Sequence, residues 1–163
     1  MERRLELIAD MSVAIWVHLI CVAVALAIGG YVLARRKGDR LHRILGRIWV
    51  ALMFVGALSS FLIREINDGG FSPIHVLSAY TLFSISMGVW AIRRTPKRVS
   101  AHRASMQSLY ATGLLIAGGF TFLPERLLGR LTFGEIMPIA NTVIIVPMVI
   151  LGLVLWWRSY RSG

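Results

Sequence analysis

Five long stretches without charged side chains constrain this chain more than any other feature of its sequence. Four of them run for 21 to 24 residues with no Lys, Arg, Asp or Glu: 11–34, 69–92, 104–124 and 136–157. A fifth, residues 44–63, qualifies if Arg47 extends its side chain toward the lipid headgroups. About 20 apolar residues in a helix cross the roughly 30 Å core of a bilayer. The sequence therefore predicts an all-α integral membrane protein with five transmembrane helices, at about residues 12–34, 44–63, 71–92, 104–123 and 136–157.

Composition supports this class and excludes others. Hydrophobic residues make up 56% of the 163 residues and charged residues only 16%, too few to cover a soluble domain. The net charge is +10, but the basic residues flank the apolar stretches, which argues against a nucleic-acid partner. The single cysteine, Cys21, excludes a disulfide within the chain and a cysteine-rich metal site. No linker separates a second domain, so residues 1–163 are predicted to form a single transmembrane domain.

The distribution of Lys and Arg predicts the orientation in the membrane. The loops 35–47 and 93–103 and the C-terminal tail hold 13 of the 18 basic residues, and the other side holds five. Because basic loops stay in the cytoplasm, we expect the N-terminus outside and the C-terminus inside. Trp16 is expected near the outer interface, and Trp49 is among the tryptophans expected near the inner one.

The four histidines fall into two layers of depth. By helix rise, His18 and His75 lie about 8 and 11 Å outward of the middle of the first and third helices. His42 and His102 lie about 17 Å inward of the middle of the second and fourth. In a four-helix bundle wound in sequence order each pair is diagonal, and a bis-histidine haem needs an imidazole on each side of its ring. The pattern therefore predicts a four-helix bundle core with an outer and an inner haem b.

Three alternatives remain open for these histidines. Neutral His18 and His75 can instead form hydrogen bonds to a serine or a carbonyl on another helix. His42 and His102, each followed by an arginine, are also suited to bind lipid phosphates. The layers lie about 25 Å or more apart by helix rise, so a single outer haem is the third alternative.

Other chemistries find no support in the sequence. It has no Gly-rich nucleotide loop, no HExxH motif and no Ser-His-Asp arrangement, and every Asp and Glu lies outside the spans. No catalytic residue is therefore predicted. Pro138, Asn141 and Pro147 predict an irregular fifth helix, in which Asn141 bonds a neighbouring helix or a quinone headgroup. Residues 125–135 mix leucines with charges and are predicted to lie along the outer membrane interface.

Three sequence stretches resemble a known family. They are RLHRILGRIWV at 40–50, FSPIHVLSAYTLF at 71–83 and AHRASMQSLYATGLLIAGGFTFLPERLL at 101–128. Over about residues 12–130 the chain is similar to a bacterial domain-of-unknown-function family of small predicted membrane proteins with HR-x-LGR and HR-x-x-M motifs. The resemblance implies a place in the bacterial inner membrane and assigns no activity.

A more distant likeness concerns the alternation of histidines over four successive helices. It resembles the ascorbate-linked di-haem transmembrane cytochromes b. Carried over residue by residue, this resemblance implies that His18 and His75 ligate the outer haem iron and that His42 and His102 ligate the inner one. The intervals of 24, 33 and 27 residues between the histidines are less even than in that family.

Two functions of different classes follow from the sequence. The first is a small b-type cytochrome that passes electrons through bis-histidine haem between an outer donor or quinone and an inner redox partner. The second is a non-catalytic accessory subunit that packs with lipid against a larger respiratory or photosynthetic membrane complex. Absorbance separates the two, because only the cytochrome has a redox-sensitive haem spectrum.

Overall fold

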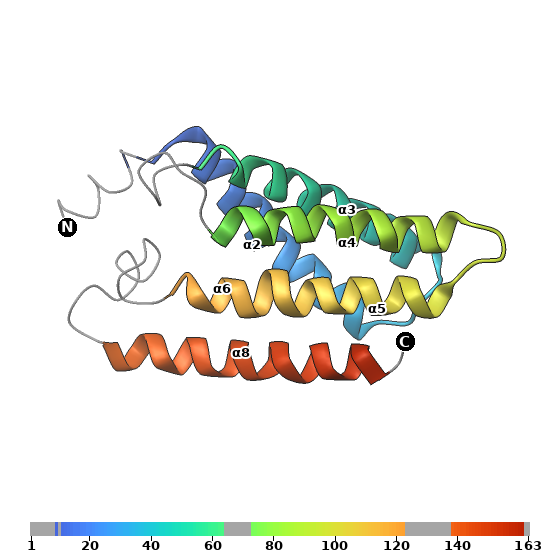
Figure 1. The fold of residues 1–163 in the computed structure, drawn as a ribbon. Helices are drawn as coiled ribbons and strands as arrows, with labels where there is room; N and C mark the ends of the chain where they lie inside the picture. The colour runs from blue at the N-terminus through green and yellow to red at the C-terminus, as the bar shows by residue number, and fades with distance from the viewer. Residues whose placement is uncertain (1–8, 10, 64–72, 123–137, 162–163) are drawn as a thin grey trace. The chain divides into compact units, whose positions relative to one another are not determined.

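The computed structural model describes residue 9 and residues 11–63, 73–122 and 138–161. Five long helical segments, and no strand, make up this part of the chain (Figure 1). They are α2 (Val13–Ala34), α3 (Arg40–Ser60), α4 (Pro73–Arg93), the continuous run of α5 (Val99–Leu109), η1 (Tyr110–Ile116) and α6 (Ala117–Phe120), and α8 (Pro138–Arg161). α2, α3 and residues 74–93 of α4 are each long and apolar enough to cross a membrane, and a shorter apolar helix covers 145–155. The predicted all-helical membrane class is confirmed.

α3 and α5 begin earlier than the sequence predicts, inside the basic loops. α3 begins at Arg40 instead of residue 44, because the Asp39 carboxylate accepts a hydrogen bond of 2.7 Å from the main-chain N–H of His42 and caps the helix. α5 begins at Val99 instead of residue 104. Lys and Arg are good helix formers. A charged residue therefore marks where the membrane ends and not where the helix ends.

A tight turn joins α2 to α3 and is shaped by its own residues. Gly38 has a φ of 87°, in the left-handed region that glycine adopts without steric cost. Lys37 donates hydrogen bonds from Nζ to the carbonyls of Val32, at 3.2 Å, and Arg35, at 2.7 Å. These bonds occupy carbonyls that the last turn of a helix leaves without partners. The turn therefore returns the chain directly into α3.

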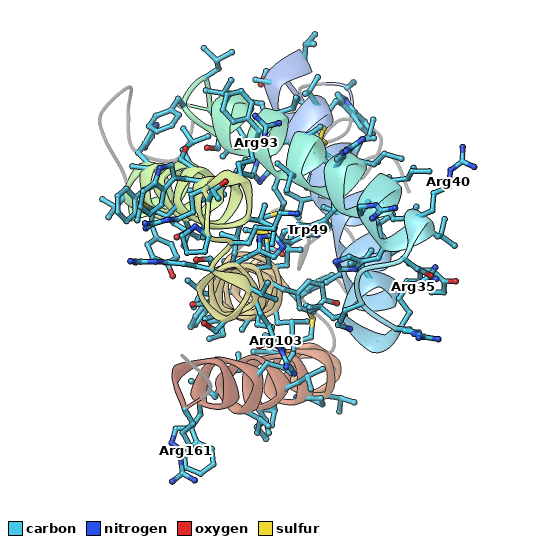
Figure 2. All side chains as sticks on the ribbon, turned by 90° about the vertical axis from the view of Figure 1, so that its right-hand side faces the viewer. Arg35, Arg40, Trp49, Arg93, Arg103 and Arg161 are labelled. Atoms are coloured by element: carbon cyan, nitrogen blue, oxygen red, sulfur yellow. The ribbon has the colours of Figure 1, made fainter. Side chains whose placement is uncertain are left out.

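The chain folds as two compact units, residues 12–106 and residues 1–11 with 107–163. In the first unit α2 packs along α3, and α3 packs against α4. Trp49 of α3 is 4% exposed and donates its indole N–H to the carbonyl of Ala25 on α2 at 3.0 Å. Figure 2 shows Trp49 among the helices, whereas Arg40 extends away from them. Trp49 therefore joins two helices, and its expected place near the inner interface stays a prediction.

In the second unit α8 packs closely on the π-helix η1. A Cβ atom added to Gly152 of α8 would lie 3.0 Å from the carbonyl oxygen of Ala111 and 3.3 Å from Cβ of Leu115. Pro147 lies inside α8 without ending it, and the change of hydrogen-bonding pattern falls in η1, which the sequence does not predict. The predicted interfacial segment 125–135 and the side chain of Asn141 lie outside the described part of the chain.

Candidate functional site

All four histidines predicted as ligands belong to the unit of residues 12–106. His18 lies on α2, His42 on α3, His75 on α4 and His102 on α5. Each helix of this unit therefore supplies one imidazole. A histidine can ligate a metal only through a ring nitrogen that carries no proton, and the hydrogen bond made by the other nitrogen decides which one that is.

His18 has one ring nitrogen engaged by the neighbouring helix. Its Nδ1 lies 2.8 Å from the carbonyl oxygen of Gly56 on α3. A carbonyl only accepts, so Nδ1 carries the proton, and in the neutral ring Nε2 is the free acceptor nitrogen. Gly56 is buried, and a Cβ added to it would already be in van der Waals contact with Cys21 of α2, at 3.5 Å. The absence of a side chain at this position brings the two helix backbones close together.

His102 has the same arrangement on the other pair of helices. Its Nδ1 lies 2.9 Å from the carbonyl oxygen of Gly88 on α4, so Nδ1 again donates and Nε2 is free to accept. A Cβ added to Gly88 would collide with the end of Met106 and would lie 3.1 Å from Cβ of Ser105. Glycine is therefore needed for α5 to come within reach of this carbonyl.

His75 lies at the end of α3 where His18 is also held. It is 5% exposed, and its ring lies 5.7 Å from the ring of Phe61, centroid to centroid. Phe61 follows Gly56, the partner of His18, by five residues, which is about 7.5 Å of helix rise. His18 and His75 therefore contact residues near the same end of α3, Gly56 within the helix and Phe61 at its C-cap.

His42 lies in the first turn of α3, where its main-chain N–H is bonded to the Asp39 cap. Its Nδ1 is buried and has no hydrogen-bond partner among the described residues. The ring interacts electrostatically with His102 and with the charged side chains of the α2–α3 turn. The structure therefore brings the two histidines of the predicted inner pair into one neighbourhood, although they lie on α3 and α5.

The described residues do not form a cluster suited to a bare metal ion. Within the described residues, no group of three or more His, Cys, Asp and Glu side chains is placed to hold an ion. Protein zinc sites take three or four such ligands. The iron of a b-type haem takes its equatorial ligands from the macrocycle and only axial ligands from the protein.

Sequence reasoning missed a row of buried hydroxyl groups that continues from His75 along α4. Ser78, Thr81 and Ser84 are 5%, 6% and 8% exposed, and the hydroxyl of Ser78 is hydrogen-bonded to that of Ser60 on α3. Hydroxyls of this kind join helices within a membrane. The sequence feature that could have predicted this row is a polar residue at every third position from 75 to 84 in a mostly apolar helix.

The unit of residues 12–106 defines a class of protein: a helical membrane protein in which two partly buried histidines, His18 and His102, bridge neighbouring helices through main-chain carbonyls. Residues 15–156 match the family described as predicted membrane protein (DUF2306), and the chain belongs to that family. No curated protein and no solved structure matches the chain. The family membership predicted from the HR-x-LGR and HR-x-x-M motifs is confirmed, and the likeness to the di-haem cytochromes b stays a prediction.

Proposed function

We propose that this protein is a small b-type cytochrome, in which His18 and His75 hold an outer haem b and His42 and His102 hold an inner one. One observation carries the proposal. His18 and His102 each donate Nδ1–H to a glycine carbonyl on the adjacent helix, at 2.8 and 2.9 Å. Such a bond is typical of metal-ligating histidines, because it sets the tautomer and the ring orientation before the metal binds.

The residues of the chain have three tasks in this proposal. The carbonyls of Gly56 and Gly88 orient the two rings and raise the basicity of their free nitrogens. The apolar helices keep water away from the imidazoles. A bound haem supplies reversible one-electron chemistry, with a potential that depends on the axial ligands and on burial.

The proposal also assigns a direction. With the N-terminus outside, the His18 and His75 pair faces an outer donor or a quinone, and the His42 and His102 pair faces a partner in the cytoplasm of a bacterium. The basic loops 35–47 and 93–103 support this orientation, since they hold 11 of the 18 basic residues.

Haem content of the purified protein tests the proposal. The full chain is produced with ample haem supply, purified in detergent, and analysed for its ratio of haem to protein and for its oxidised and reduced spectra. We expect one or two haems per chain and a low-spin spectrum that changes on reduction. A colourless, folded protein contradicts the proposal and favours the accessory-subunit alternative.

A further inference from the structure

A group of charged side chains gathers where α2 ends and where α3 and α5 begin. Its members are Arg35, Lys37 and Arg103, together with the single acid Asp39, and we call it the basic cluster. Burial, followed by the charges of Arg103 and Arg35, lowers the pKa of Lys37. The three cations therefore lie close enough to repel one another. With one acid among them, the cluster keeps a formal charge of +2, three cations less one carboxylate.

Arg35 is the member whose hydrogen-bonding capacity is least used. Its side chain is 18% exposed, and its Nη2 pairs with the carboxylate of Asp39. The Nε and Nη1 atoms are buried and have no hydrogen-bond partner among the described residues. The guanidinium lies 5.5 Å from the ring of Tyr31, measured to the ring centre. A guanidinium is always charged and has donors only, so a buried one requires further acceptors.

Lys37 cannot supply those acceptors, and neither can the rest of the turn. The Lys37 ammonium is directed to the carbonyls of Val32, Leu33 and Arg35. One carboxylate oxygen of Asp39 accepts from the main-chain N–H of His42, and the other pairs with Arg35. The acceptors for Arg35 Nε and Nη1 therefore come from outside the cluster, and a negatively charged group with several acceptor oxygens suits the cationic surroundings.

We propose that the basic cluster binds a phosphate group, either from a lipid headgroup or from free phosphate. A phosphate presents several oxygens to donors that come from different helices, and guanidinium groups bind it in a bidentate manner. Its negative charge is opposite in sign to the +2 of the cluster. The cluster also lies at the ends of membrane helices, where basic pockets between helices bind anionic headgroups. This inference does not rest on the presence of haem.

Arg35→Gln, compared with Arg36→Gln, provides the sharpest test. Both variants remove one positive charge, but Arg36 is an exposed neighbour. The full chain in detergent is titrated with inorganic phosphate, or with phosphatidylglycerol in mixed micelles, against chloride at equal ionic strength, and its melting temperature is measured. We expect one phosphate-bearing probe to raise the melting temperature relative to chloride. The Arg36→Gln variant should retain this rise. In Arg35→Gln the apparent affinity should fall about tenfold or more, because charge-assisted hydrogen bonds are lost.

The two probes distinguish the two sources. Stabilisation by phosphatidylglycerol alone assigns the site to a lipid headgroup, and stabilisation by inorganic phosphate assigns it to the free ion. If Arg35→Gln does not fold, Arg103→Gln replaces it, since Arg103 takes no part in the Asp39 ion pair. Equal losses in Arg36→Gln and in the cluster variant would overturn the proposal in favour of diffuse charge. Loss of haem in Arg35→Gln without any phosphate effect in the wild type would also overturn it.

Discussion

At the scale of single residues, ring N–H groups that reach a main-chain carbonyl on the next helix recur in this protein. His18 bonds Gly56, Trp49 bonds Ala25, and His102 bonds Gly88. In hydrocarbon, a polar ring atom has no water as an alternative partner. These hydrogen bonds therefore fix the orientations of the rings, which hydropathy does not predict. The depth of the histidines, read from the sequence, marks them as candidate functional residues. It does not predict which main-chain carbonyl each ring bonds.

Replacement of Trp49 tests the structural value of one such bond. Trp49→Phe removes the indole N–H and leaves a small void, since the ring is only 4% exposed. We expect a loss of about 1–3 kcal/mol in the free energy of unfolding, measured by reversible unfolding in mixed micelles. Trp16→Phe is the matched control, because Trp16 is 42% exposed. Equal effects of the two variants would contradict the assigned role of Trp49.

Asp39 gives the turn between α2 and α3 a predictable pH dependence. The hydrogen bond from the main-chain N–H of His42 is the main cause that lowers the pKa of Asp39, opposed by partial burial and reinforced by Arg35. A lowered folded-state pKa means that the carboxylate stabilises the protein above its unfolded pKa of about 3.9. That stabilisation disappears as the pH falls through the folded-state pKa. The melting temperature of Asp39→Ala should therefore lie below that of the wild type at pH 7 and approach it in acid.

Asp39→Asn is the control for that experiment, because an asparagine still caps α3 but carries no charge. Its melting temperature should lie between those of the wild type and Asp39→Ala at pH 7. A difference between wild type and Asp39→Ala that stays constant from pH 7 to pH 3 would show that the carboxylate charge contributes nothing.

At the scale of helices, the lengths of the uncharged stretches were enough to predict the number and order of the helical segments. The starts of α3 and α5 were predicted too late, because charged residues continue a helix beyond the membrane. The π-helix η1 was not predicted at all. No local pattern in residues 110–116 specifies its wider turns, and Gly152 of α8 packs against it.

Gly88 provides a prediction at this scale. In Gly88→Ala the added Cβ displaces the flexible end of Met106 and lies 3.1 Å from Cβ of Ser105, so Ser105 must move away by a few tenths of an ångström. Overpacking of this kind should destabilise the protein by about 1–3 kcal/mol. Gly46→Ala is the matched control, because a Cβ at Gly46 meets nothing within 4 Å. It should leave stability unchanged or raise it by up to about 1 kcal/mol through helix propensity. Thermal unfolding of both variants in one detergent makes the comparison.

At the scale of the whole molecule, the membrane class followed from composition, and the orientation follows from charge. Thirteen of the 18 basic residues lie on the side assigned to the cytoplasm. A reporter fused after Gly163 should therefore be cytoplasmic, so that a fluorescent protein fusion is bright and an alkaline phosphatase fusion is inactive. The opposite result would contradict the predicted topology of five spans with the N-terminus outside.

Only part of the candidate site could be predicted from the sequence. Depth along each helix predicts the pairs His18 with His75 and His42 with His102, because helix rise converts residue number into depth, and this pairing stays a prediction. The tautomers of His18 and His102 could not be predicted from the sequence, because they depend on the nearby carbonyls of Gly56 and Gly88. The sequence also could not predict that Nε and Nη1 of Arg35 have no hydrogen-bond partner among the described residues, because this results from the fold of the α2–α3 turn.

The most direct test of the central claim is the reduced-minus-oxidised absorption spectrum of the four single histidine-to-alanine variants, each purified with ample haem supply. In the proposed assignment, His18→Ala and His75→Ala each remove one of the two histidines that would hold the outer haem, so both should lose the same low-spin component. His42→Ala and His102→Ala should lose a different component and leave the first intact. An unchanged spectrum in His18→Ala, or the loss of one shared component in all four variants, would contradict the assignment of two histidine pairs.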